Sequence, residues 1–322
     1  MVTSNKVRIS STDIEKMNNF VLSYNKTIPN FFDENVCEII PIQVQRGTIK
    51  VYHHKPEKTI AKRPIVFIPG FGTASITWRN FHASHHGDIE YYHIETRDKK
   101  SAKIRRGIKT NLSIDRIALD IAETIEQLGL NNNDYVLMGA CMNGGVLLHG
   151  LIHNYFKPPT TIAMDPFTKW TQNRVFVKYF LPVLPPVIFG ALKNIIGRSV
   201  MKNMTNEEQI KRNQANIDEA VAWKWRKFAI TNVNLDINNE LSKIKEEVII
   251  LHGPPDKYHP EGTFMKVAER IPKGRFFHMG VSNDIREIMV GVFATEFAKI
   301  SKEDGIPKLL QPYEVELDRS SN

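Results

Sequence analysis

A short stretch in the middle of the chain, VLMGACMNGGVLLHG at 136–150, constrains the fold most strongly. An apolar run meets a cluster of small residues and then continues in a helix-like apolar pattern. A chain that turns from a buried strand into a helix within three or four residues needs small neighbours, because the residue at the turn adopts a strained backbone conformation. The small residues flanking the turn are Gly139, Asn143, Gly144 and Gly145. The sequence therefore predicts a strand–turn–helix unit with the thiol of Cys141 at its apex.

Strand and helix patterns alternate around this unit. Apolar runs typical of buried strands occur at PIVFIPG, DIEYYHIET, DYVLMGA, TTIAMDPF, EEVIILHG and GRFFHMG. Amphipathic helix patterns separate several of them, and one helix, IDRIALDIAETIEQLGL, is capped by Ser113 and closed by Gly129. A hairpin of two antiparallel strands, CEIIPIQVQRG and TIKVYHHK, is expected before them. The alternation predicts an α/β fold with a mainly parallel, twisted sheet that helices cover on both faces.

One long helical block interrupts this alternation. It is apolar, carries Trp170, Trp223 and Trp225, and stands between two core strands. Its position indicates a lid over the carboxyl edge of the sheet, where ligands bind in such folds. The alternative is a small helical subdomain without a ligand. We therefore expect an N-terminal helix (11–24) and lead-in at 1–37, a core at 38–166 and 241–300, a lid at 167–240 and a C-terminal tail at 301–322.

Charge and composition exclude some classes of protein. A chain of 322 residues with 42% hydrophobic residues can bury a large core. The net charge of +8 would suit a polyanion, but the basic runs RDKKSAKIRR and KNMTNEEQIKR contain no interleaved aromatic residues, so we expect no nucleic-acid partner. Two cysteines, Cys37 and Cys141, form no disulfide framework and indicate a reducing compartment.

The sequence predicts neither a secretion signal nor a membrane span. The first twenty residues contain no apolar core of a signal peptide, so we expect a cytoplasmic protein. The longest stretch without charge, YFLPVLPPVIFGAL at 179–192, carries three prolines and falls short of the roughly 20 residues that cross a bilayer. This segment could instead rest on a membrane surface or line an apolar tunnel.

These features together resemble the α/β-hydrolase superfamily over about residues 38–300. The motif G-x-C-x-N-G-G at 139–145 resembles the family's nucleophile elbow, in the variant with a cysteine found in dienelactone hydrolases and polyhydroxyalkanoate synthases. FIPGFGTASITW resembles the loop after the third strand, which implies that the backbone N–H groups of Phe71 and Met142 form the oxyanion hole. ILHGPPD resembles the turn that delivers the acid, which implies Asp256 for this role.

The resemblance fails at the histidine. In this family the catalytic histidine follows the last strand, but the corresponding loop here reads GVSNDIRE, with Asn283 in its slot. His278, at or near the end of the last strand, is the candidate for a displaced base, and His259 in the KYHP turn is a weaker one. His252 is expected to pack or to hydrogen-bond to backbone. The HASHH cluster at 82–86 has no nearby acidic partners, so we expect no metal site there.

The resemblance implies a cysteine-dependent acyl hydrolase or acyltransferase acting on a small apolar ester or thioester. Cys141 would attack the carbonyl, the two N–H groups would hold the oxyanion, and Asp256 would orient the base. No cofactor is expected. The alternative is a catalytically degenerate hydrolase fold that binds an apolar ligand or a partner, and Asn283 is the residue that favours it.

Overall fold

The computed structural model describes residues 35–83, 88–131, 134–185, 207–253, 262–281 and 286–319. It also describes six isolated positions, namely Glu15, Asn19, Ile188, Gly190, Lys193 and Ile195. The expected N-terminal helix at 11–24 lies outside the described residues except for Glu15 and Asn19, both of which are helical.

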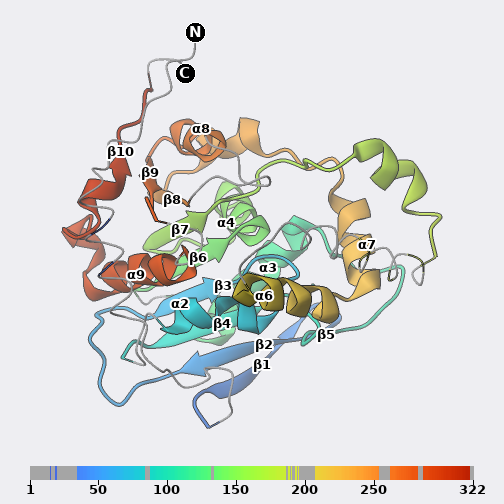
Figure 1. Ribbon diagram of the computed structural model, residues 1–322, viewed down its shortest axis with the longest axis horizontal. Coiled ribbons are helices and arrows are strands. Elements are labelled where there is room, and N and C mark those ends of the chain that lie inside the picture. The colour runs from blue at the N-terminus through green and yellow to red at the C-terminus, as the bar shows by residue number, and fades with distance from the viewer. Residues whose placement is uncertain are drawn as a thin grey trace.

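A single twisted sheet of ten strands, in the order β1-β2-β4-β3-β6-β7-β8-β9-β10 with β5 beside β2, forms the centre of the described chain (Figure 1). The six consecutive strands β4-β3-β6-β7-β8-β9 run parallel to one another. Strands β1, β2, β5 and β10 pair with their neighbours in antiparallel fashion. The strands are β1 Glu38–Val44, β2 Gly47–His54, β3 Ile65–Ile68, β4 Tyr91–Glu95, β5 Lys103–Ile104, β6 Val136–Ala140, β7 Thr160–Met164, β8 Val248–His252, β9 Gly274–His278 and β10 Glu314–Val315. The predicted hairpin and mainly parallel sheet are confirmed.

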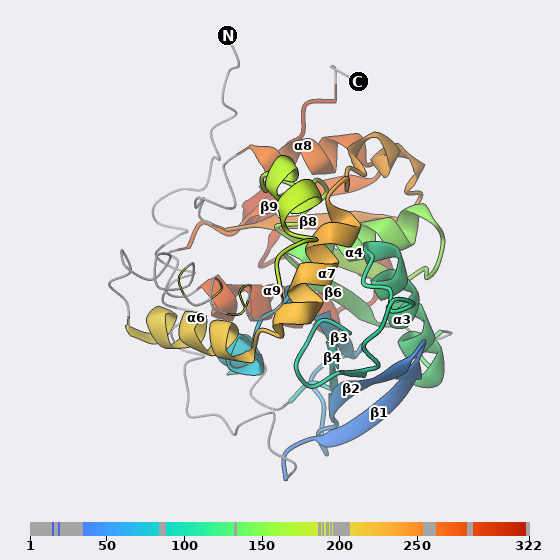
Figure 2. The same ribbon diagram turned by 90° about the vertical axis from the view of Figure 1, so that its right-hand side faces the viewer.

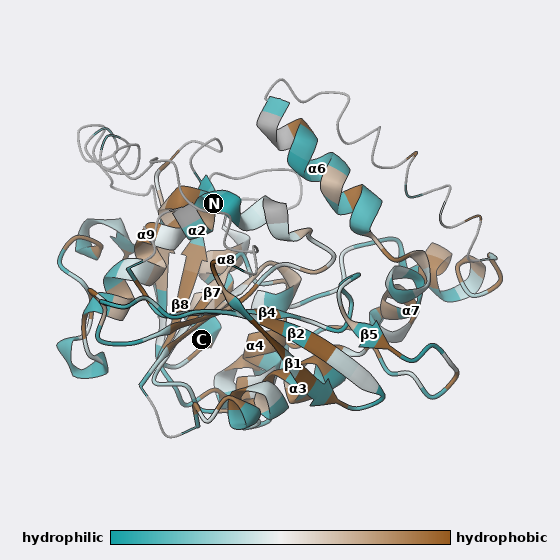
Figure 3. Ribbon diagram, turned by 90° about the horizontal axis from the view of Figure 1, so that it is seen from below, coloured by the Kyte–Doolittle hydropathy of each residue, from teal (hydrophilic) through white to brown (hydrophobic). Residues whose placement is uncertain are grey.

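Helices cover both faces of the sheet and enclose two apolar clusters (Figures 1 and 2). One face packs against α3 (Ile114–Gln127), α4 (Met142–Ile152) and α8 (Thr263–Arg270). The other packs against α2 (Arg79–Ala83) and α9 (Arg286–Lys299), which contact each other. Hydrophobic colour follows the interior strands in Figure 3. Helices on both faces explain why β3, β6, β7 and β8 are buried along their whole length.

Helix α3 begins and ends where the sequence predicts. The Ser113 side chain accepts a hydrogen bond from the Arg116 N–H, which satisfies one of the free donors at the helix start. Gly129 has φ = 69°, a left-handed conformation that closes the helix at low steric cost. The apolar stripe of α3 then packs on the sheet, so local sequence and tertiary packing agree.

The helical block and the C-terminal segment complete the described chain. The block contains the π-helix η2 (Phe176–Phe180), α6 (Glu207–Glu219), α7 (Ala222–Asn232) and the 3-10 helix η3 (Asn238–Lys243). The segment expected to be a tail differs from that expectation: β10 pairs with β9, and Leu310 and Tyr313 are buried. Elements β5, α2 and α8 were not predicted from the sequence. Strands β5 and β10 are only two residues long, which is too short to show an alternating pattern.

Candidate active site

Cys141 lies at the turn between β6 and α4, and its backbone has φ = 55° and ψ = −123°. A residue other than glycine with positive φ is uncommon and costs of the order of 1–3 kcal/mol, so the surrounding structure has to impose it. The Cys141 N–H donates to the Met164 carbonyl at 2.8 Å, and the Cys141 carbonyl accepts from the Phe167 N–H at 3.1 Å. The thiol residue is partly exposed, whereas Cys37 is buried. The predicted strand–turn–helix unit is therefore present.

Close backbone contacts explain the small residues around the turn. A Cβ on Gly145 would lie 2.0 Å from the Phe167 carbonyl oxygen. A Cβ on Gly139 would lie 2.9 Å from the Asn143 carbonyl oxygen and 2.7 Å from a Leu147 methyl group. Since real Cβ atoms do not approach other atoms so closely, α4 could not pack against β6 and the following loop if either glycine carried a side chain.

Asn143 lies in the first turn of α4, and the residue with positive φ at this turn is Cys141. The buried side chain of Asn143 donates from Nδ2 to the Pro69 carbonyl at 2.5 Å and to Thr96 Oγ1 at 3.3 Å. Asn143 therefore ties the start of α4 to the loop after β3, which is the reason to have an amide at this position.

The two backbone groups expected to form an oxyanion hole are the N–H groups of Phe71 and Met142. Within the described part of the chain, neither the Phe71 N–H nor the Met142 N–H donates a hydrogen bond. The Phe71 N–H follows Gly70, and a Cβ on Gly70 would lie 3.5 Å from the Cys141 Cβ. Stabilisation of a developing oxyanion requires N–H groups without another acceptor, and these two lie beside Cys141, whose backbone is strained.

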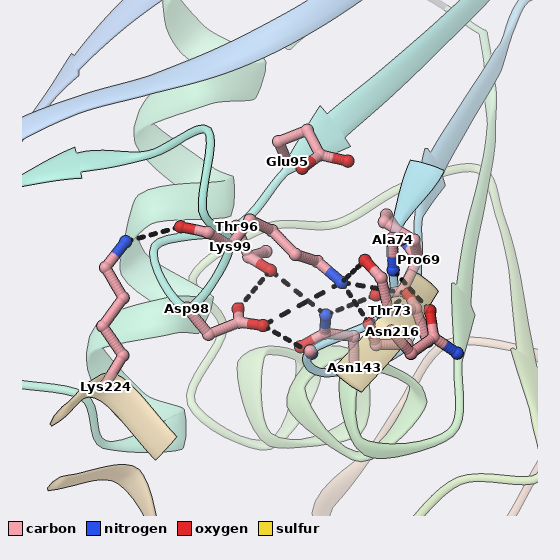
Figure 4. A network of polar contacts seen from close by, with 12 residues as sticks. Pro69, Thr73, Ala74, Glu95, Thr96, Asp98, Lys99, Asn143, Asn216 and Lys224 are labelled. Atoms are coloured by element: carbon pink, nitrogen blue, oxygen red, sulfur yellow. Dashed lines mark hydrogen bonds and ion pairs between the residues drawn. The ribbon is translucent and has the colours of Figure 1, made fainter. Parts of the chain in front are cut away.

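A buried polar network fixes the loop that carries Phe71 (Figure 4). The Lys99 ammonium donates to the Gly70 carbonyl, and to the carbonyl and hydroxyl of Thr73 at 3.1 and 3.0 Å. The Asp98 carboxylate accepts from the Gly72 N–H at 2.7 Å and from the Thr96 hydroxyl at 2.6 Å. The Gly70 carbonyl and the Phe71 N–H belong to one trans peptide and point in opposite directions. By holding the carbonyl, Lys99 therefore sets the direction of the N–H.

Helices α6 and α7 contact the same loop. A Cβ on Gly72 would lie 2.4 Å from the Trp225 ring, and Gly72 itself has φ = 64°. The Phe71 ring lies 4.0 Å from the Phe228 ring, measured between centroids. From α6, Asn216 Oδ1 accepts hydrogen bonds from the Ala74 N–H and the Thr77 hydroxyl, each at 2.6 Å. The helical block thus contacts the loop beside Cys141.

Lys224 of α7 is a buried cation in this region. Its ammonium donates to the carbonyls of Lys99 and Ala102, the former at 2.5 Å (Figure 4). Burial lowers the pKa of Lys224 to about 8, while the nearby Asp98 carboxylate acts in the opposite direction. This role could not be predicted from the sequence, because a lysine in a helix usually lies on a solvated face.

Cys141, Asp165, His252 and His278 lie in one row across four neighbouring strands. The register pairs the residues that precede them, namely Ala140, Met164, Leu251 and Phe277. Each residue of the row follows one of these four at the carboxyl edge of the sheet. His252 and His278 are themselves paired. Strands lie about 4.8 Å apart, so His278 is separated from Cys141 by three spacings, or about 14 Å of backbone.

Asp165 and His252 form a buried pair that the sequence reading missed. His252 Nδ1 donates to Asp165 Oδ1 at 2.5 Å, and Arg286 at the start of α9 binds the other carboxylate oxygen. The expectation that His252 packs or bonds to backbone was therefore incomplete, because its ring nitrogen bonds a carboxylate. Asp165 has φ = 43°, a second strained residue beside the turn. Its position directly after a buried strand, at the same edge as Cys141, was the available signal.

The remaining predicted residues differ in what the structure says of them. His278 is the last residue of β9, as expected, and its Nδ1 accepts from the Gly280 N–H at 3.1 Å. Asp256, His259 and Asn283 lie outside the described residues. His82 packs against the rings of Tyr91 and His93. No group of three or more His, Cys, Asp or Glu side chains in the described ranges could hold a metal ion.

Comparisons with known proteins identify the fold. No protein-family model matches the sequence, and no curated protein matches it either. Among solved structures, an esterase from Thermogutta terrifontis matches with a TM-score of 0.60 and 18% identity, over 80% of this chain and 95% of its own. An enol-lactonase from Burkholderia xenovorans LB400 matches with a TM-score of 0.58 and 13% identity, over 77% and 94%. A hydrolase from Pseudomonas aeruginosa PA01 matches with a TM-score of 0.61 and 11% identity, over 80% and 98%.

The chain has the α/β-hydrolase fold. At identities this low the comparisons establish the architecture alone, so the chemistry has to be argued from the residues.

Proposed function

We propose that this chain is a cysteine-dependent acyl hydrolase or acyltransferase that acts on an apolar ester or thioester. The observation that carries the proposal is Cys141, held at positive φ beside two unsatisfied backbone N–H groups, those of Phe71 and Met142. A structural cysteine would need neither the strained backbone nor the free donors. The solved hydrolases that share the fold, among them the esterase and the enol-lactonase, make acyl chemistry the first candidate.

In the proposed reaction, the thiolate of Cys141 attacks the substrate carbonyl carbon and forms a carbon–sulfur bond. The carbonyl electrons move to the oxygen, and the N–H groups of Phe71 and Met142 stabilise the resulting oxyanion. When the intermediate collapses, the bond to the leaving alcohol or thiol breaks and a thioester to Cys141 remains. Water then attacks this thioester in a hydrolase, and a second alcohol, thiol or amine attacks it in an acyltransferase.

The release step needs a base, and the proposal for it comes from the resemblance. Asp256 is the proposed acid and His278 the candidate imidazole, with Asn283 in the usual histidine position. The register argues for a slow release step, because His278 starts three strands from Cys141 and its Nδ1 already accepts from the Gly280 N–H. We therefore expect acylation to outrun deacylation.

The test is a reaction with p-nitrophenyl acetate followed by mass spectrometry of the intact chain. We expect a burst of about one p-nitrophenol per chain and an acetyl adduct on Cys141, followed by slow turnover. Cys141→Ala should abolish burst and adduct, while Cys37→Ala, which removes the buried cysteine, should leave both unchanged. A normal burst in Cys141→Ala would exclude Cys141 as the nucleophile.

The second candidate is a degenerate hydrolase that binds an apolar ligand or a partner, and Asn283 is the residue that favours it. The proposed lid at 167–240 would then enclose the ligand, since Trp225 and Phe228 already lie against the Phe71 loop. Medium-chain acyl ligands should then change tryptophan fluorescence and raise the melting temperature without adduct formation. A substrate that acylates Cys141 separates the two candidates.

A further inference from the structure

The helical turns around η2 expose an unusual number of large apolar side chains. Five residues within nine positions are between 42% and 76% exposed. Val177 and Leu181 on the opposite side are buried against Val233 of the segment after α7. The segment is therefore apolar on both sides, which is typical of a helix buried against something on each side. The exposed residues, called the η2 patch below, are Val175, Phe176, Tyr179, Phe180 and Val183.

Basic residues accompany this patch and acidic residues are absent from its part of the sequence. Between Asp165 and Glu207 the chain carries six lysine or arginine residues and no aspartate or glutamate, so this stretch alone has a charge of +6 out of the total +8. Arg174 and Lys178 are exposed within the patch, and the Lys178 ammonium lies 5.6 Å from the centre of the Tyr179 ring. A surface of aromatic and aliphatic side chains with interspersed cations complements an anionic lipid headgroup layer.

We infer that the η2 patch docks the protein on a membrane surface that contains anionic lipids. Phe176 and Phe180, whose rings stack with centroids 6.2 Å apart, would enter the boundary between headgroups and acyl chains. Arg174 and Lys178 would contact phosphate groups. Within the described ranges, no helix is long and apolar enough to cross a bilayer.

The patch is joined to the proposed active site by α7, which stands beside it at the right of Figure 1. Arg226 of α7 donates to the Leu181 carbonyl at 2.9 Å, and Trp225 contacts Gly72 in the loop beside Cys141. A docked patch would hold α7 near the membrane surface. The inference itself goes beyond the proposed function and does not depend on it.

The experiment is co-sedimentation of the full chain with vesicles. Vesicles of phosphatidylcholine with about one third phosphatidylglycerol should bind roughly tenfold more tightly than pure phosphatidylcholine, and high salt should reduce the difference. The double substitution Phe176→Ser/Phe180→Ser should weaken binding by roughly tenfold. The matched control Ile60→Ser/Leu309→Ser, which removes two exposed apolar residues elsewhere, should not.

Charge reversal provides the second arm. Arg174→Glu/Lys178→Glu should remove the preference for anionic vesicles, while Lys55→Glu/Lys58→Glu, an equal reversal at exposed lysines outside the patch, should keep it. Equal binding by all variants, or none by the unmodified chain, would overturn the inference. So would a dimer in sedimentation that Phe176→Ser/Phe180→Ser dissociates, because the patch would then be covered by a second copy. Cys141→Ala should bind vesicles normally, so this result is independent of activity.

Discussion

The two halves of the carboxyl edge of the sheet use polar groups in opposite ways. At the ends of β3 and β6, the Phe71 and Met142 N–H groups donate to no described residue, although a buried network surrounds their loop. At the ends of β7 and β8, the Asp165 carboxylate and the His252 ring bind each other, and Arg286 binds the second carboxylate oxygen of Asp165. In the first half the two backbone donors have no acceptor among the described residues, whereas in the second half the polar groups join two strands and a helix.

Under the proposed function, this difference separates acylation from release of the acyl group. Preorganised donors would stabilise the oxyanion formed when Cys141 is acylated, without reorganisation at that moment. In the proposed reaction, release of the acyl group requires an imidazole beside Cys141, whereas His252 and His278 lie two and three strands away from it in the row. Each substitution below alters one half of this edge, so an effect on the other half would show that the two are coupled.

The largest effect is expected from breaking the buried charges of the second half. Asp165→Asn would leave the Arg286 guanidinium without its carboxylate and weaken the bond to His252, so the free energy of unfolding should fall by about 3–5 kcal/mol. The control is Asp236→Asn, whose carboxylate pairs with the exposed Lys169 and should cost under about 1 kcal/mol. Urea unfolding at neutral pH measures both. Equal losses in the two variants would contradict the structural role of the Asp165 cluster.

The next effect concerns the missing base. Asn283→His should supply an imidazole at the family's position and accelerate the slow phase with p-nitrophenyl acetate by roughly a hundredfold or more. His278→Ala should change this phase little, since His278 starts three strands from Cys141. The burst amplitude should be the same in all three proteins. Rapid multiple turnover in the unmodified chain, abolished by His278→Ala, would show that His278 is the base after all.

The first half can be weakened through Lys99 without touching either N–H group. Lys99→Met removes the ammonium that holds the Gly70 carbonyl, so the Phe71 N–H should lose its fixed direction and the acylation rate should fall by roughly ten- to a hundredfold. KM should change less than kcat, because the oxyanion exists only after attack. Lys100→Met, at the exposed neighbouring position, is the matched control. A fall in melting temperature without a fall in the burst rate would limit Lys99 to a role in stability.

The sequence predicted the first half of the edge much better than the second. Strand patterns and the glycines around Cys141 report backbone constraints that act locally, so the elbow and the parallel sheet could be placed in advance, while Phe71 was implied by the resemblance of its loop to the family. The bond between Asp165 and His252 joins residues 87 positions apart, and only the register of β7 and β8 brings them together. Lys99 and Lys224 look like solvated lysines until the loop and α7 are folded around them.

The smallest effect is a pH dependence that originates in Lys224, at the boundary between the helical block and the first half. The folded pKa of Lys224 is about 8, below the 10.5 of an unfolded lysine, so between these values the unfolded chain binds more protons. The free energy of unfolding should therefore rise with pH, by about 1–2 kcal/mol from pH 8 to 10. Above pH 10 the trend should reverse, since burial raises the pKa of Tyr52 to about 12 and folded tyrosines keep their protons longer. Lys224→Met should remove most of the rise below pH 10 and keep the fall above it, whereas Lys100→Met, on an exposed lysine, should keep both. A rise that persists in Lys224→Met would assign it to another group and would separate α7 from the electrostatics of the Phe71 loop.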